Sequence, residues 1–306
     1  MKLNKEITLK NIRIPIQFRK NFQQVRIVPK KDYFQIEVVI RKPETEYTKE
    51  AKLQNKKLKS IGIDIGVDNL ATVTSDDPVL KPFIINGRSL KSINQFYNKQ
   101  AAKLKSIYSK QKIKTGSKLR RLGYKRMMRI NDYMHKTSRR IVDYCILNDV
   151  KTVYIGLNKG WKQEIDMSKQ NNQNFISIPF DSLIRKLEYK LEEVGIEFVV
   201  LNESYTSKCS ALDKEQICHH DNYQGKRIRR SLFRTSKRQI LNADINGSLN
   251  ILRLGLKSDF DFGNKFNPIR YKNINAISDV FRFGKPADRG WVFQPDNLNM
   301  NEKFVL

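Results

Sequence analysis

Runs of apolar residues divide the chain into short strands and longer helices. The clearest run, residues 61–74, reads Ile-Gly-Ile-Asp-Ile-Gly-Val-Asp-Asn-Leu-Ala-Thr-Val-Thr. It predicts a hairpin in which Asp68 and Asn69 form the turn and Asp64 lies in the middle of the first strand. A carboxylate among apolar neighbours is costly unless it is solvated, paired or bound to a cation. An ordinary hairpin with a half-exposed Asp64 is the alternative.

Strands then alternate with helices. The β-type runs 82–86, 151–156 and 196–201 each precede a helical pattern or follow one. Residues 180–194 carry leucines at helical spacing, and residues 242–254 predict a further helix. Because parallel strands need helical crossovers, this order favours an α/β fold in which the later strands run parallel to the first.

The amino-terminal region is β-rich and separate. Residues 24–28 and 33–40 predict a hairpin, and residues 12–16 resemble a short edge strand interrupted by Pro15. Residues 41–59 are polar without a sustained apolar face, which is typical of a linker. We therefore expect a domain boundary near residue 58.

Composition points to a polyanionic partner. The chain has 59 Lys and Arg against 31 Asp and Glu, a formal net charge of +28. It contains no signal peptide and no apolar run long enough for a bilayer, so nucleic acid is favoured over a membrane surface. Cys145, Cys209 and Cys218 lack paired spacing, which is typical of reduced thiols in a cytosolic protein.

Two segments concentrate the positive charge. Residues 101–140 hold 14 Lys and Arg against one acid, Asp132, and the glycines at 116 and 123 predict a turn between a first helix and a second one at 124–147. Residues 204–240 form a second basic segment, interpreted as a loop. The basic side chains expected to contact nucleic acid are Lys118, Arg120, Arg121, Lys125, Arg126, Arg129, Arg139, Lys226, Arg227, Arg229, Arg230 and Arg234.

Three acids lie at positions that an α/β sheet would bring together. Asp64 is in the first strand, Glu203 follows the last strand, and Asp244 opens the final helix, where an Asp is also a common cap or dipole partner. Such a cluster repels itself unless cations are present, which predicts a pair of Mg²⁺ or Mn²⁺ ions roughly 4 Å apart. Two such ions, surrounded by basic surface, are typical of a nuclease.

Three blocks of residues resemble the signature of the TnpB family, the transposon-encoded relatives of type V CRISPR effectors. They are Gly62–Thr72, Tyr205–Ser210 and Asn242–Gly247, within a resemblance that runs from about residue 24 to 255. The resemblance implies an RNase H-like (RuvC) nuclease domain, guided by an RNA from the transposon end, that cuts double-stranded DNA beside a short motif. Asp64 and Asp244 fall on the family's first and third catalytic acids.

The resemblance also implies a domain plan. Residues 1–58 correspond to a partial β-barrel, wedge-like unit and linker. Residues 59–255 correspond to the nuclease domain, with inserted basic helices at 88–148 and the basic loop at 204–240. Residues 256–306 form a carboxy-terminal tail with no assigned chemistry. Such a protein is expected in the cytoplasm of a bacterium or archaeon, associated with the nucleoid.

The chain departs from the family pattern at three places. The usual position of the second acid reads Tyr154-Ile155-Gly156, so Glu203 is the expected substitute, with Glu164 on the surface loop 161–178 as a weaker candidate. The usual four-cysteine zinc ribbon is reduced to Cys209 and Cys218 beside two histidines, so a metal-free loop is expected instead of zinc. Most of the usual target-recognition helices are also absent.

Three functions remain open at this point. An RNA-guided endonuclease requires Asp64, Glu203 and Asp244 to share a metal site. If Glu203 does not reach the other two acids, the same scaffold would bind guide RNA and DNA without cutting, as a guided repressor. The short amino terminus favours the third interpretation, a truncated transposon remnant. No oligomeric state is indicated.

Overall fold

A computed structural model describes residues 6–9, 12–15, 22–29, 34–41, 59–157, 178–263 and 268–271. The chain forms two compact units, residues 1–54 and 55–306. In the first unit, β1 (Glu6–Leu9) pairs with β2 (Ile12–Pro15), and β3 (Phe22–Pro29) pairs with β4 (Phe34–Ile40), both antiparallel. The predicted hairpin and the short strand before it are confirmed, whereas β1 was not predicted.

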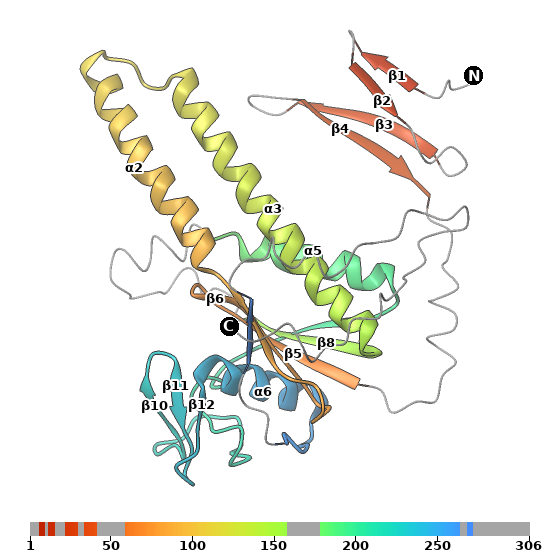
Figure 1. Ribbon diagram of the computed structural model, residues 1–306, viewed down its shortest axis with the longest axis vertical. Coiled ribbons are helices and arrows are strands. Elements are labelled where there is room, and N and C mark those ends of the chain that lie inside the picture. The colour runs from red at the N-terminus through yellow and green to blue at the C-terminus, as the bar shows by residue number, and fades with distance from the viewer. Residues whose placement is uncertain are drawn as a thin grey trace, which may run out of the picture. The chain divides into compact units, whose positions relative to one another are not determined.

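The second unit is a mixed α/β structure built on a six-stranded sheet (Figure 1). Its strand order is β13-β7-β6-β5-β8-β9. The strands are β5 (Lys59–Ile65), β6 (Asn69–Ser75), β7 (Phe83–Asn86), β8 (Val150–Gly156), β9 (Glu197–Leu201) and β13 (Ile269–Tyr271). β5, β6 and β7 form an antiparallel meander, while β8 and β9 run parallel to β5. The α/β fold with a mixed sheet is therefore confirmed.

Helices cover both faces of this sheet (Figure 1). They are α2 (Arg88–Lys110), α3 (Ser117–Leu147), α5 (Phe180–Glu193) and α6 (Ala243–Leu256). Side chains alternate along β5, so Ile61 and Ile63 join a core that includes residues of α3 and α5, while Gly62 and Asp64 face α6. One strand thus provides both the core and a polar position beneath a helix.

The turn expected between the glycines at 116 and 123 is wrong. Helix α3 begins at Ser117, so Lys118, Arg120 and Arg121 are helical. Gly123 lies inside the helix, where an added Cβ would make only ordinary contact with Tyr97 of α2, at 3.9 Å. A single glycine weakens a helix by about 1 kcal/mol, which is too little to end one with this much favourable sequence on either side.

The segment 204–240, interpreted as a loop, contains a small antiparallel sheet. Its strands are β10 (Lys226–Arg229), β11 (Leu232–Arg234) and β12 (Ile240–Asn242). Phe233, Leu241, Ile245 and Leu249 form a separate core between this sheet and α6. The strands have three or four residues and few apolar positions, so no alternating pattern reveals them. Most of the linker 41–59, all of the loop 161–178 except Ile178, and most of the tail lie outside the described residues, and Glu164 is among them.

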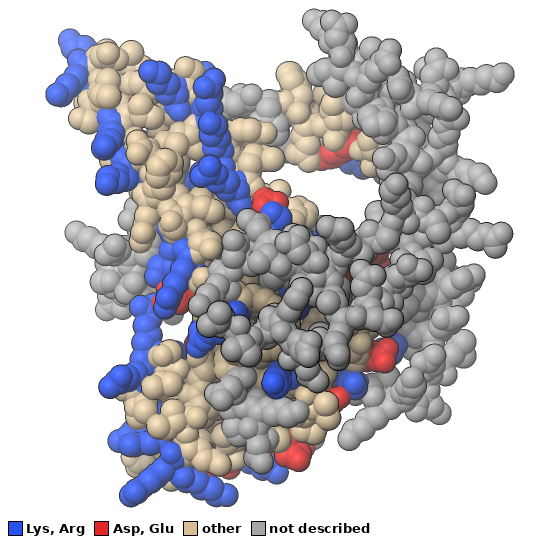
Figure 2. Space-filling view, in the orientation of Figure 1, with Lys and Arg blue, Asp and Glu red and all other residues tan. Residues whose placement is uncertain are grey.

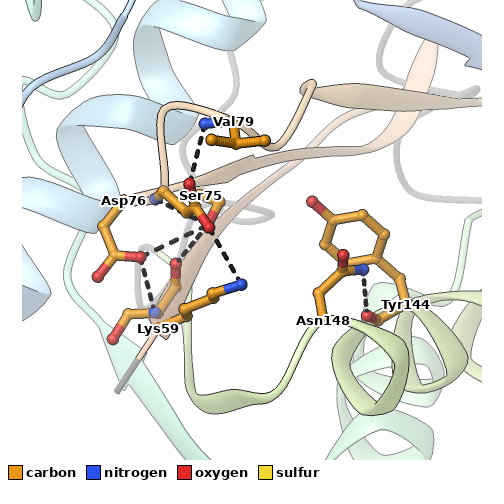
Figure 3. Close-up of polar contacts among 8 residues, drawn as sticks. Lys59, Ser75, Asp76, Val79, Tyr144 and Asn148 are labelled. Atoms are coloured by element: carbon orange, nitrogen blue, oxygen red, sulfur yellow. Dashed lines mark hydrogen bonds and ion pairs between the residues drawn. The ribbon is translucent and has the colours of Figure 1, made fainter. Parts of the chain in front are cut away.

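Polar contacts hold the end of β5 that is far from Asp64 (Figure 3). The backbone N–H of Ser60 donates to Asp76 Oδ1 at 2.9 Å, and Lys59 Nζ lies 3.1 Å from Asp77 Oδ2. The backbone N–H of Asp76 returns a hydrogen bond to the carbonyl of Ser60 at 3.2 Å. The start of the central strand is thereby fixed to the end of β6.

Two glycines predict opposite effects of the same substitution. A Cβ at position 62 would lie 2.4 Å from the carbonyl oxygen of Ser248, so Gly62→Ala must displace α6 and is expected to destabilise the fold by about 1–3 kcal/mol or more. Gly123→Ala meets no such contact and is expected to stabilise it by about 0.5–1 kcal/mol. Urea denaturation of both variants measures the difference. A destabilising Gly123→Ala would contradict the continuous helix α3.

Candidate active site

Asp64 lies where the sheet meets the first turns of α6. Asn242 caps the helix, which begins at Ala243, and its side chain accepts hydrogen bonds from the backbone N–H groups of Asp244 and Ile245. A Cβ at Gly247 would lie 2.9 Å from Asp64 Oδ2, so the carboxylate rests directly against the helix one turn beyond Asp244. A side chain at position 247 would displace the carboxylate of Asp64 from this place.

Glu203 lies over the glycine at the end of β8. Its Oε2 is 2.5 Å from the position that a Cβ at Gly156 would occupy. Ile63 pairs with Ile155, so Gly156 is the next position along the strand beside Asp64, and it pairs with Leu201 on its other side. The carboxylate of Glu203 therefore fills the space that a side chain at 156 would fill.

Asp244 is held by two partners. Asn69 Nδ2 donates to Asp244 Oδ2 at 2.5 Å, and Arg227 of β10 lies 3.3 Å from Asp244 Oδ1. From the sequence, Asn69 is expected in the turn and Arg227 at a nucleic-acid contact. A polar residue beside a turn carries no further signal in the sequence, so the contact between Asn69 and Asp244 was not predicted.

The charges of Asp244 and Glu203 both act on Asp64. Burial raises the pKa of Asp64 well above its ordinary value, and the charges of Asp244 and Glu203 raise it further, while Arg227 lowers it. Burial also raises the pKa of Glu203 to about 7. Both side chains keep some solvent exposure. The protein thus brings carboxylates together in a partly buried site. Protons or cations are needed to offset the repulsion between them.

The donor set suits a hard divalent cation. Carboxylate oxygens are the ligands that Mg²⁺ prefers, and the carboxylates of Asp64 and Glu203 accept no hydrogen bond within the described residues. Among those same residues, no three acidic, His or Cys side chains are already arranged around one metal position. Asp244 is instead directed toward Asn69 and Arg227, so coordination by all three acids requires side-chain rotation.

The loop that carries Glu203 is anchored to α6 by buried amides. Asn250 Nδ2 donates to the carbonyls of Thr206 and Cys209, both at 2.8 Å. Asn246 donates to the carbonyl of Cys209 at 2.8 Å and accepts from the backbone N–H of Ala211 at 2.9 Å. The hydroxyl of Thr206 donates to the carbonyl of Glu203 itself at 2.8 Å. One helix therefore positions both Asp244 and the loop that presents Glu203.

The predicted basic residues fall into two groups. Lys and Arg side chains follow α2 and α3 and gather again over the small sheet (Figure 2). Arg126 and Arg139 make contacts within the chain, with Asn94 Oδ1 at 2.6 Å and Asp143 Oδ1 at 2.8 Å. Arg230 lies 2.6 Å from Asp68 Oδ2. The exposed members of the predicted set are Lys118, Arg120, Arg121, Lys125, Arg129, Lys226, Arg227, Arg229 and Arg230, of which Arg227 and Arg230 also form ion pairs within the chain.

The residues considered for zinc interact among themselves. Cys209 Sγ donates to the carbonyl of Cys218 at 3.6 Å, and Cys218 Sγ lies 3.3 Å from His220 Nε2. The backbone around them is held by Glu215, which accepts from the N–H groups of Ser210 and Gln224. That this segment binds no zinc stays a prediction.

Two family models match successive parts of the chain. The model described as a probable transposase, OrfB_IS605, matches residues 37–162, and the model described as Cas12f1-like, TNB domain, matches residues 180–251. TnpB-like protein MJ1635 of Methanocaldococcus jannaschii is 24% identical over 212 residues. The chain belongs to the TnpB-like family. The match covers 63% of this TnpB-like chain but only 48% of MJ1635, so the chain spans about half the length of that curated relative.

Solved structures similar to this TnpB-like chain include two Cas12f complexes. A Cas12f1–sgRNA–target DNA complex has 22% identity and a TM-score of 0.46, covering 62% of this chain and 48% of that one. A CRISPR–Cas12f ternary complex has 18% identity and a TM-score of 0.48, covering 74% of this chain and 44% of that one. Among the described residues, no helix combines the length and apolar character needed to cross a membrane.

The raised pKa of Glu203 predicts a pH-dependent effect on stability. The folded-state pKa of about 7 exceeds the ordinary value of 4.5, so the protonated form stabilises the fold, and that stability is lost as the pH rises through 7. Glu203→Gln stays neutral. In chelator at about pH 8 it is expected to be about 1–3 kcal/mol more stable than the parent chain, and the two should converge near pH 4.5.

Urea denaturation across this pH range provides the measurement. Glu192→Gln, at an exposed position on α5, is the matched control and should show no such convergence. A difference between Glu203→Gln and the parent chain that does not change with pH would contradict the buried environment of Glu203.

Proposed function

We propose that this chain is an RNA-guided DNA endonuclease of the TnpB type. It would hydrolyse phosphodiester bonds with divalent ions held by Asp64, Glu203 and Asp244. Guide RNA from the transposon end would select double-stranded target DNA in the cytoplasm of a bacterial or archaeal cell. Family membership supports the reaction class, and the strand order β7-β6-β5-β8-β9 is the one expected of an RNase H-like sheet.

The position of Glu203 carries the proposal. The family's usual second acid would stand at Gly156, beside Asp64 on the face covered by α6. The carboxylate of Glu203 lies over that glycine and close enough to Asp64 to raise its pKa. Glu203, which extends from the loop after β9, thus occupies the space that the family's usual acid at position 156 of β8 would fill. The absence of a carboxylate at 156 is therefore no argument against cleavage.

Each residue of the site has a distinct role in this proposal. Bound divalent ions would activate a water molecule and stabilise the leaving oxygen. Asp64, Glu203 and Asp244 supply the negative charge that retains such ions, and Asn69 orients Asp244 by hydrogen bonding. Arg227 offers two N–H donors to a phosphate oxygen pair, which is the geometry that guanidinium groups recognise best.

The basic surface of α2 and α3 would hold the nucleic acid. The exposed cations of these helices outnumber the acids on them, so phosphate neutralisation releases counterions and makes binding fall steeply with salt. Lys118, Arg121 and Lys125 recur at a spacing that keeps them on one face of α3. Arg126 and Arg139 contribute through packing within the chain.

A guided DNA-binding protein without cleavage is the second candidate. It is favoured by the contacts of Asp244 with Asn69 and Arg227, because those contacts compete with metal coordination. Cleavage assays separate the two functions, whereas binding alone does not.

Substitution of the acids predicts loss of cleavage without loss of binding. With guide RNA, matching DNA and Mg²⁺, Asp64→Ala and Glu203→Ala should each lower the cleavage rate by at least about 100-fold, because each removes a metal ligand. Glu192→Ala should cleave normally. Gel analysis of end-labelled DNA measures the rate. Full cleavage by Glu203→Ala, or binding without cleavage by the parent chain, would overturn the endonuclease proposal.

Substitution of Arg227 predicts a different defect, in which cleavage is lost but Mg²⁺ affinity is not. Arg227→Ala removes a donor to the reacting phosphate and should lower the cleavage rate about 100-fold while Mg²⁺ affinity stays the same or rises, since a competing cation has gone. Isothermal titration with Mg²⁺ and single-turnover cleavage provide the two readouts. If Arg227 only stabilises the small sheet, the melting temperature will fall. Mg²⁺ affinity will then decrease instead of staying the same or rising.

A further inference from the structure

Two of the three cysteines lie close together in the segment that follows the loop of Glu203. The sulfur of Cys209 donates to the carbonyl oxygen of Cys218 at 3.6 Å, although nine positions separate the two residues in the chain. The third cysteine, Cys145 of α3, is fully buried in the main core. All three are free thiols, and the proposed cleavage reaction uses none of them.

A buried acid fixes the turn between the two cysteines. Glu215 is only 3% exposed, and its carboxylate oxygens accept from the backbone N–H groups of Ser210 at 2.6 Å and Gln224 at 2.8 Å. Its own backbone N–H donates to the carbonyl of Ser210 at 3.1 Å, and its carbonyl accepts from Arg253 Nη1 of α6 at 2.9 Å. The backbone from 209 to 218 is therefore held in a closed turn, and the two thiols are neighbours before any reaction.

The two thiols differ in their surroundings. Cys209 is fully buried, and burial raises the pKa of its thiol, whereas Cys218 is half-buried. Cys218 Sγ lies 3.3 Å from His220 Nε2, which is also 2.8 Å from the carbonyl oxygen of Gln216. A carbonyl only accepts, so Nε2 carries a proton and faces the sulfur as a donor. A donor beside sulfur favours its nucleophilic form, so a dissolved oxidant meets Cys218 first.

We propose that Cys218 is a site of oxidation by hydrogen peroxide and that Cys209 completes the reaction by forming a disulfide with it. The sulfur of Cys218 attacks one peroxide oxygen and the O–O bond breaks. Cys218 becomes a sulfenic acid, and its thiol proton leaves with the other oxygen as water. The sulfur of Cys209 then attacks that of Cys218, the S–O bond breaks, and the hydroxyl group leaves with the Cys209 proton as a second water. The two thiols lose two electrons, which the peroxide gains.

The disulfide would form on a segment that α6 holds in place. Its formation requires the Cys218 side chain to turn from His220 toward Cys209. The carbonyl of Cys209 accepts from the buried amides of Asn246 and Asn250, so the attacking residue keeps a fixed position during this turn. In reducing compartments a disulfide of this kind is transient and is reversed by thiols. The inference goes beyond the proposed function and does not depend on strand cleavage.

Thiol counting after treatment with hydrogen peroxide tests the proposal. In the reduced full chain, equimolar peroxide should lower the number of free thiols from three to one, and dithiothreitol should restore all three. Peptide mass spectrometry should find Cys209 linked to Cys218 and Cys145 unmodified. Cys209→Ser should stop at a sulfenic acid on Cys218, trapped by dimedone, and Cys218→Ser should keep both of its thiols. Cys145→Ser is the control and should form the disulfide as the parent chain does.

Two neighbouring histidines provide a matched pair for the rate. His220 contacts the sulfur of Cys218, whereas His219 packs against the ring of Tyr205 at 5.8 Å. At neutral pH, His220→Gln should slow iodoacetamide labelling of Cys218 about fivefold or more, and His219→Gln should change it about twofold or less. Melting temperatures confirm that the variants fold.

Two outcomes would overturn the proposal. One is peroxide treatment that links separate chains or leaves the sulfenic acid on Cys218 of the parent chain unresolved. The other is a Cys218→Ser chain whose Cys209 is oxidised as fast as Cys218 is in Cys209→Ser. Equal labelling rates in the two histidine variants would overturn the role of His220. The assays contain no nucleic acid and no divalent ion, so a failure of cleavage by the parent chain leaves them unaffected.

Discussion

The close approach of α6 to the central strand determines the rest of the structure. Helix and strand meet where Gly62 leaves room for Ser248 and Leu252 of α6, and Gly247 of α6 leaves room for Asp64. A carboxylate in that place is costly to ionise, so it is retained only where something offsets its charge. The polar contacts of α6, from Ser248 to the carbonyl of Gly62 and to Thr74, keep the two elements in register. The acid and the helix contact are thus one feature of the packing.

Helix α6 also links the large sheet to the small one. Its apolar residues Ile245 and Leu249 pack beneath Phe233, while Asn246 and Asn250 hold the loop that follows β9. Both amides are fully buried, so leaving either unpaired would cost about 1–3 kcal/mol. Movement of the small sheet would therefore be transmitted to Glu203 through the same helix that positions Asp244.

Much of this fold could be predicted from the sequence, because strong local patterns agree with it. The hairpin around Asp64, the strands at 83–86 and 150–156, and the helix that begins beside Asp244 all have the period that their burial requires. The small sheet could not be predicted, since β11 and β12 have three residues each and owe their stability to packing on α6. The contact from Asn69 to Asp244 joins residues 175 positions apart, and only the tertiary structure creates it.

Glu203 stands on a loop beyond the edge strand β9, not within a strand of the sheet interior. A side chain on a loop is exchanged without altering the ladder hydrogen bonds or the layers of apolar residues on either face. The acid at 203, unlike Asp64, is consequently separate from the residues that build the sheet. An acid placed on such a loop can be added or removed while the surrounding sheet keeps its backbone pairing.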